Sequence, residues 1–344
     1  MGGGWAAALL FGVGMLLLAG DGAAGVGNSC FDCHTMHHSE SGSTMLLISG
    51  CVGCHSHEGP ETVVEMGAAR IPIVYNTGGP PDAMLAGGNF HWVVTMGDQY
   101  GHNVLGVSGP DQYLATAPGG SAGCANSCHQ SLALAEVHVP GGSLALDDGC
   151  QSCHGSVKHH RPERPPGTPA DAETGWYRFL KAPALHGFAA NKPGVGGIGV
   201  ADWERHADSD HHNIYLADDG SNNPTQRSLS RFCSGCHQNF HTQVGRATPW
   251  LRHPTNYAIP DRGEFAAVIG AAYNPQVPVA KPDLYSHQSE VVEAGDQVAC
   301  VSCHRAHGSP YPDMLRWDYS QMRAHQGGEA VGNGCFFCHT AKDA

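Results

Sequence analysis

The stretch Cys30-Phe-Asp-Cys33-His34 shows the pattern that decides this fold, because it recurs along the whole chain. Two cysteines lie three positions apart, and a histidine follows the second one. All 14 cysteines of the 344-residue chain fall into seven pairs, each followed by histidine, and six of the pairs have this spacing. C-x-x-C-H is the attachment signature of c-type haem. The sequence therefore predicts seven covalently attached haems.

Each motif places three reactive groups where one haem can use them. The two thiols form thioethers with the porphyrin vinyl groups, and the histidine ligates the iron. Positions i, i+3 and i+4 share one face of a helix, so we expect a short helical turn at each motif. The run Cys124-Ala-Asn-Ser-Cys128-His129 has one extra residue, which predicts an irregular turn there.

The predicted attachment cysteines are Cys30, Cys33, Cys51, Cys54, Cys124, Cys128, Cys150, Cys153, Cys233, Cys236, Cys300, Cys303, Cys335 and Cys338. The predicted proximal iron ligands are His34, His55, His129, His154, His237, His304 and His339.

Other uses of paired cysteines explain the pattern less well. A disulfide framework would suit an exported chain with an even cysteine count, but it leaves the seven histidines without a reason. Zinc sites combine C-x-x-C units or Cys/His clusters and need no histidine beside every second cysteine. A C-x-x-C redox motif is expected once, next to a βαβ pattern, and not seven times.

The composition predicts mostly coil with short helices and few strands. The chain has 47 glycines and 22 prolines, and only 14% of its residues are charged. Fewer than about 50 residues are available for each haem, so the haems must supply much of the apolar core that long loops otherwise lack. We expect a haem-cored multihaem cytochrome c with its seven haems in a chain.

The chain divides into three parts on sequence grounds. Residues 1–25 contain an apolar run with small residues after it, as in a secretory signal peptide, although no Lys or Arg precedes the run. Export is required in any case, because haem is attached outside the cytoplasmic membrane. A proline-rich stretch then separates a four-haem half, residues 26–160, from a three-haem half, residues 161–344, which together are expected to form one continuous unit.

The surplus of histidines favours a second imidazole on each iron. The chain has 24 histidines, and only seven are proximal. His37 and His307 follow their own motifs too closely to bind the same haem easily, so each is expected to ligate a neighbouring one. The predicted distal ligands are His37, His102, His138, His160, His212, His253 and His307, with His38, His57, His91, His159, His211 and His241 as substitutes.

The net charge of the chain limits the kinds of partner that it is expected to bind. The formal net charge of −13, without a basic patch, argues against a nucleic-acid partner. An acidic surface suits solubility, or contact with a cationic partner or an oxidised metal surface. The expected partners are other redox cytochromes, a second copy of the chain in a homopolymer, and a metal oxide or other extracellular electron acceptor.

Several segments resemble the multihaem c-type cytochromes with doubled C-x-x-C-H motifs of metal-respiring bacteria. They include Cys30-Phe-Asp-Cys-His-Thr-Met-His37, Trp250-Leu-Arg-His-Pro-Thr255 and Cys300-Val-Ser-Cys-His-Arg-Ala-His-Gly308. The resemblance implies electron transfer at the outer surface or outside the cell, in some members through polymeric filaments. It supports His37, His102, His212, His253 and His307 as ligands, and it implies that a histidine of one subunit can cap a haem of the next.

Three functions follow from these observations. The first is an extracellular or outer-surface electron conduit with His/His-ligated haems, which can polymerise. The second is a multihaem reductase of a nitrogen or sulfur oxyanion, which needs one open iron position with acid/base groups above it; the lysine that often marks such a haem follows none of the seven pairs. The third is a soluble periplasmic electron shuttle.

Overall fold

The computed structural model describes residues 29–39, 46–67, 69–114, 117–120, 132–133, 149–155, 157–160, 177–180, 194–220, 227–237, 239–240, 246–247, 250–251, 253–285, 290–324 and 332–342. Cys124, Cys128, His129, His138 and His241 lie outside the described residues, as does the apolar run of residues 5–19. In the part described, no helix is both long and apolar enough to cross a membrane.

Short helices lie at the six described motifs, as the motif spacing predicts. The α-helices are α1 (Cys51–His55), α2 (His91–Met96), α3 (Leu229–Cys233), α5 (Cys300–Cys303) and α6 (Cys335–Cys338). The 3₁₀-helices are η1 (Cys30–Asp32), η3 (Asp98–Tyr100), η4 (Gly149–Ser152), η5 (Tyr177–Phe179), η6 (Gly263–Phe265), η7 (Pro312–Met314), η8 (Tyr319–Gln321) and η9 (Thr340–Lys342). Of these helices, η1, α1, α5 and α6 begin at the first motif cysteine.

The strands are short and form small sheets. They are β1 (Ser56–His57), β2 (Val63–Met66), β3 (Ala69–Pro72), β4 (Tyr75–Asn76), β5 (Gly197–Ile198), β6 (Ile214–Leu216), β7 (Arg246–Ala247), β8 (Trp250–Leu251), β9 (Val279–Lys281) and β10 (Gln297–Val298). Four of them form one sheet in the order β10-β9-β6-β5, in which β6 and β9 are parallel and the other neighbours antiparallel. β1 with β4, β2 with β3, and β7 with β8 form separate pairs.

The four-stranded sheet separates two apolar clusters. Successive residues of a strand point to opposite faces. Val279 accordingly packs with Val268 and Val292 in one cluster, and Ala280 packs with Tyr215 in the other. A buried ion pair joins the end of β9 to the residue before β10, with Lys281 Nζ 2.7 Å from an Asp296 carboxylate oxygen.

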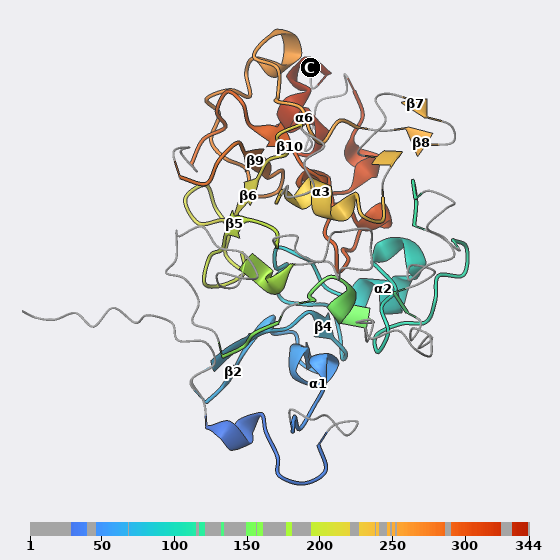
Figure 1. The fold of residues 1–344 in the computed structure, drawn as a ribbon. Helices are drawn as coiled ribbons and strands as arrows, with labels where there is room; N and C mark the ends of the chain where they lie inside the picture. The colour runs from blue at the N-terminus through green and yellow to red at the C-terminus, as the bar shows by residue number, and fades with distance from the viewer. Residues whose placement is uncertain are drawn as a thin grey trace, which may run out of the picture.

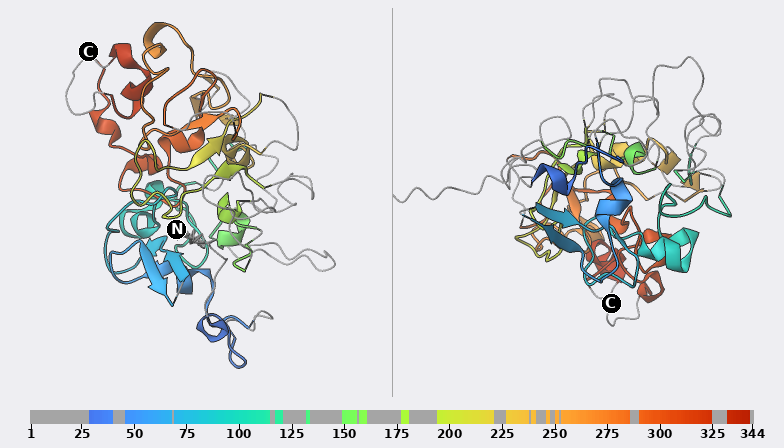
Figure 2. Two further views of the ribbon diagram at one scale, coloured as in Figure 1. Left: turned by 90° about the vertical axis from the view of Figure 1, so that its left-hand side faces the viewer. Right: turned by 90° about the horizontal axis from the view of Figure 1, so that it is seen from below.

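The described molecule is elongated, with the two terminal motifs at opposite ends. Figure 1 shows η1 at the bottom and α6 at the top, and the turned view on the left of Figure 2 keeps this separation. The four-stranded sheet and α3 lie in the upper part, above α1 and β4. The chain therefore carries its first and last haem motifs at its two ends in space.

A segment after α5 joins the two halves of the chain. Residue 308 bridges to Gly88, and its carbonyl accepts a hydrogen bond of 3.0 Å from Asn89 N. His307 N donates to Gly87 O at 2.7 Å. Gly308 has φ +131°, and a Cβ there would lie 2.5 Å from Tyr100 O, so this approach requires glycine.

Candidate haem sites

Six of the seven motifs fall among the described residues, and each forms a helical turn. The histidine amide donates to the carbonyl of the first cysteine, as in His34 N to Cys30 O at 2.8 Å and His304 N to Cys300 O at 3.0 Å. No disulfide joins any two of the twelve described cysteines. Both thiols and the imidazole of a motif are therefore held within one turn.

Five motif histidines face a second imidazole from elsewhere in the chain. The ring-centre distances are 5.9 Å for His34 with His160, 6.2 Å for His55 with His159, 6.1 Å for His154 with His307, 6.1 Å for His237 with His102, and 6.3 Å for His339 with His253. The interplanar angles, in the same order, are 14°, 24°, 51°, 43° and 89°.

These distances match the space that one metal ion needs. With metal–imidazole bonds of about 2.0 Å and a ring centre roughly 1.2 Å beyond each bonding nitrogen, two opposed imidazoles on one metal have ring centres about 6.4 Å apart. Direct ring stacking would be much closer, as in His212 on Tyr273 with centres 3.5 Å apart. Each of the five pairs can therefore supply two nitrogen ligands to a single iron.

Backbone carbonyls fix the tautomer of five of these ten rings and of His304. Nδ1 lies 2.7 Å from Arg178 O in His154 and 2.7 Å from Asp313 O in His304. The same contact joins His55 to Pro72 O, His102 to Ala306 O, His237 to Pro118 O and His253 to Pro254 O. A carbonyl can only accept, so Nδ1 carries the proton and Nε2 presents its lone pair to a metal.

Burial keeps several of these imidazoles neutral. It lowers the pKa of His237 to about 4, together with the charge of His102, and the pKa of His307 to about 3, together with that of His154. Burial also lowers the pKa of His102 and of His304. A neutral ring is the form that ligates iron, so the electrostatics suit coordination at pH 7.

Two buried arginines beside α5 fit the anionic edge of a haem. Arg305 donates to Leu85 O at 2.6 Å, and Arg316 donates to Pro275 O at 3.1 Å. Burial and the neighbouring Arg316 lower the pKa of Arg305 to about 9. Neither arginine has an ion pair with a described carboxylate, and buried charges need a partner. Haem propionates would provide such partners, so these residues fit the group that the motifs predict.

The structure places the predicted ligands unevenly. His102, His160, His253 and His307 each lie beside a motif histidine. His37 is exposed on the N-terminal segment, and among the described residues no second imidazole faces His304. His212 is buried, with Nδ1 2.9 Å from Asn213 O.

His159, which the sequence analysis names only as a substitute, also faces a motif histidine, His55. The sequence signal is the doublet of His159 and His160, whose rings face the histidines of the first two motifs because neighbouring Cα atoms are only about 3.8 Å apart.

The recurring motif turns, the paired imidazoles and the coil-rich fold define a multihaem c-type cytochrome. A family model described as "doubled CXXCH motif" matches residues 290–344, which hold the last two motifs. The curated protein "C-type cytochrome OmcS" of Geobacter sulfurreducens is 24% identical over 364 aligned positions, which cover 84% of this chain and 78% of OmcS.

Two solved structures have a similar fold. One, titled "Outer Membrane Cytochrome S Filament from Geobacter Sulfurreducens", matches with a TM-score of 0.50 and 19% identity over 93% of this chain and 92% of that one. The other, titled "Cryo-EM of the OmcS nanowires from Geobacter sulfurreducens", matches with a TM-score of 0.53 and 21% identity over 90% and 88%. This chain is thus an electron-transfer cytochrome with covalent c-type haem, and the reductase alternative is not favoured.

Proposed function

We propose that this protein is an extracellular or outer-surface electron conduit that carries seven haems and assembles into a homopolymer. The observation that carries the proposal is the set of five imidazole pairs with ring centres 5.9–6.3 Å apart. An iron held by two imidazoles has no open position, so it transfers electrons and binds no substrate. The titles of the OmcS filament structures support a polymer, and the acidic surface suits a cationic or metal-oxide acceptor.

Contacts between the motif thiols support an order for the haems. Cys51 lies beside Cys150, and Cys233 lies beside Cys300. Cys33 also lies near Cys54, Cys153 near Cys236, and Cys303 near Cys335. Since each of these sulfurs marks one edge of its haem, the order among the described motifs is one, two, four, five, six and seven.

The second motif thus adjoins the fourth. Changing both Cys150 and Cys153 to Ala removes the haem of motif four and should abolish conduction along the molecule. Conduction that survives this change would contradict this order.

The exposed His37, together with a His304 that no second described imidazole faces, supports ligation between subunits. His37 follows η1, and η1 lies at one end of the described molecule. We therefore assign the sixth ligand of the haem at motif six to His37 of a neighbouring copy. His212, which is buried with its Nδ1 engaged, and His138 are the predicted distal ligands left for the haem at motif three.

The test is electron microscopy of sheared extracellular material, with haem staining and mass identification of this chain. Long uniform filaments that contain seven haems per chain are expected. His37→Ala should give discrete particles with one high-spin haem, whereas the neighbouring exposed His38→Ala should still form filaments. Discrete particles from the unmodified protein would favour the soluble shuttle.

A further inference from the structure

Two turns of unusual backbone conformation lie beside motif histidines. Arg178 and Phe179, in η5, have φ +52° and +53°, and Asp313 and Met314, in η7, both have φ +58°. Each turn closes with an i to i+3 hydrogen bond of 3.4 Å, from the following leucine amide. Two consecutive left-handed residues resemble a type I′ turn, which normally takes Gly, Asn or Asp. Arginine, phenylalanine and methionine are unfavourable in it.

The first central residue of each turn presents its carbonyl to a motif histidine. Arg178 O accepts from His154 Nδ1, and Asp313 O accepts from His304 Nδ1, both at 2.7 Å. A right-handed turn would aim these carbonyls elsewhere. The same uncommon conformation thus occurs twice, each time with the same contact.

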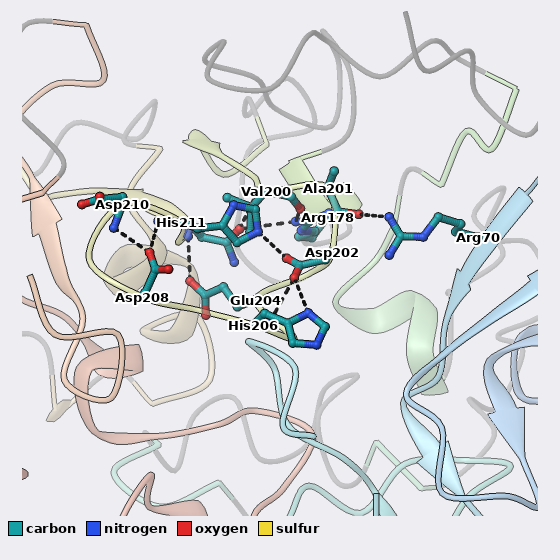
Figure 3. A network of polar contacts seen from close by, with 11 residues as sticks. Arg70, Arg178, Val200, Ala201, Asp202, Glu204, His206, Asp208, Asp210 and His211 are labelled. Atoms are coloured by element: carbon teal, nitrogen blue, oxygen red, sulfur yellow. Dashed lines mark hydrogen bonds and ion pairs between the residues drawn. The ribbon is translucent and has the colours of Figure 1, made fainter. Parts of the chain in front are cut away.

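The surrounding chain holds the first turn in place. The Arg178 guanidinium donates to Val200 O at 2.7 Å and to the buried Asn213 side chain at 3.3 Å, and it lies 5.8 Å from the ring centre of Trp203. Figure 3 shows Arg178 within the polar network of this loop, with Arg70 approaching Ala201 from the other side. Backbone strain persists only where neighbouring structure enforces it.

The second turn is held through its ends. Leu315 forms an isolated bridge with His304, and the Ser309 hydroxyl donates to Leu315 O at 2.5 Å. The Asp313 side chain is exposed, so substitutions there change the backbone preference without removing a buried contact.

We propose that Arg178 and Asp313 are positioning residues whose carbonyls orient His154 and His304 and tune the haems of motifs four and six. A carbonyl on Nδ1–H fixes the ring orientation and raises the basicity of the ligating nitrogen. A more basic ligand stabilises the ferric state, so both haems are held at a lower reduction potential than they would have without the turns. This inference rests on the proposed haem ligation.

The test compares glycine with valine at the same position. Glycine accepts a positive φ and valine does not, and at position 178 both remove the guanidinium. Arg178→Gly should keep the potential of the haem at motif four. Arg178→Val should raise it. In a spectropotentiometric titration, about one seventh of the total haem absorbance change should then occur at a higher potential, and one low-spin electron paramagnetic resonance signal should change. The pair Asp313→Gly and Asp313→Val should do the same for motif six.

The number of haems per chain, measured by mass spectrometry, separates the positioning role of the two turns from the proposed function. Seven haems per chain in every variant, with a shift only in the valine variants, is the expected result. Unchanged potentials and spectra in both valine variants, or equal shifts with glycine and valine, would overturn the positioning role. Fewer than seven haems in the unmodified protein would instead contradict the proposed function.

Discussion

The assignment of His307 to the haem of motif four makes a prediction for the variant His307→Ala. The His307 ring centre lies 6.1 Å from that of His154. The Phe90 ring stacks on the His307 ring, with ring centres 4.7 Å apart. Alanine has no ligating atom, so this one iron loses its sixth ligand. In the proposed seven-haem protein His307 ligates one haem, and about one seventh of the iron should therefore become high-spin in this variant.

Two measurements check this magnitude. Spin quantitation by electron paramagnetic resonance should find the high-spin fraction, and carbon monoxide should bind at one equivalent per reduced chain. His206→Ala is the matched control, because the His206 side chain is 73% exposed and contacts Asp202 rather than a motif histidine. If His307→Ala stays entirely low-spin and binds no carbon monoxide, the pairing of His307 with His154 is wrong.

Three further predictions rest on geometry and burial. The rings of His253 and His339 are perpendicular (89°), which predicts a low-spin electron paramagnetic resonance signal of large g anisotropy that is lost in His253→Ala. The rings of His34 and His160 are nearly parallel (14°), which predicts a rhombic signal that is lost in His160→Ala. Lys281→Met should cost about 3–5 kcal/mol of unfolding free energy, because it strands a fully buried carboxylate, whereas Arg205→Met, in an equally short but partly exposed pair, should cost at most about 1 kcal/mol in denaturant titrations. Burial raises the pKa of Asp202, but hydrogen bonds from His211 and His206 outweigh burial and leave this pKa lowered. The stabilising contribution of the Asp202 carboxylate is therefore present above the unfolded pKa of 3.8 and is lost as pH falls through the folded pKa. Asp202→Asn should flatten that part of the acid-unfolding curve.

Local chemistry was predictable from the sequence, and long-range pairing was not. The i, i+3, i+4 spacing predicts the helical turn at each described motif, because it depends only on residues within the motif. The ring of His102 faces that of His237 because residues 87–101 pack against residues 305–309, and no local sequence pattern predicts this packing. The turns at Arg178 and Asp313 were equally hidden, because Arg-Phe and Asp-Met are not sequences that favour a positive φ.

The segment from His304 to His307 explains why the two halves of the chain should act as one unit. His304 belongs to motif six, Ala306 O fixes the ring of His102 opposite His237, and His307 faces His154. Four residues thus reach three sites, and two of the imidazole pairs join a histidine before residue 160 to one after it.

A protease site inserted at the predicted boundary, residues 161–169, tests this unit in the complete haem protein. After cleavage the halves should remain together on gel filtration and keep every iron low-spin, because two of the proposed ligand pairs, His102 with His237 and His154 with His307, and the pairing of Gly88 with Gly308 cross the cut. In denaturant, separation should coincide with the appearance of two high-spin haems. Halves that separate with all their irons six-coordinate would show that these ligands are local, and the crossing pairs would then not be the bonds that hold the electron path together.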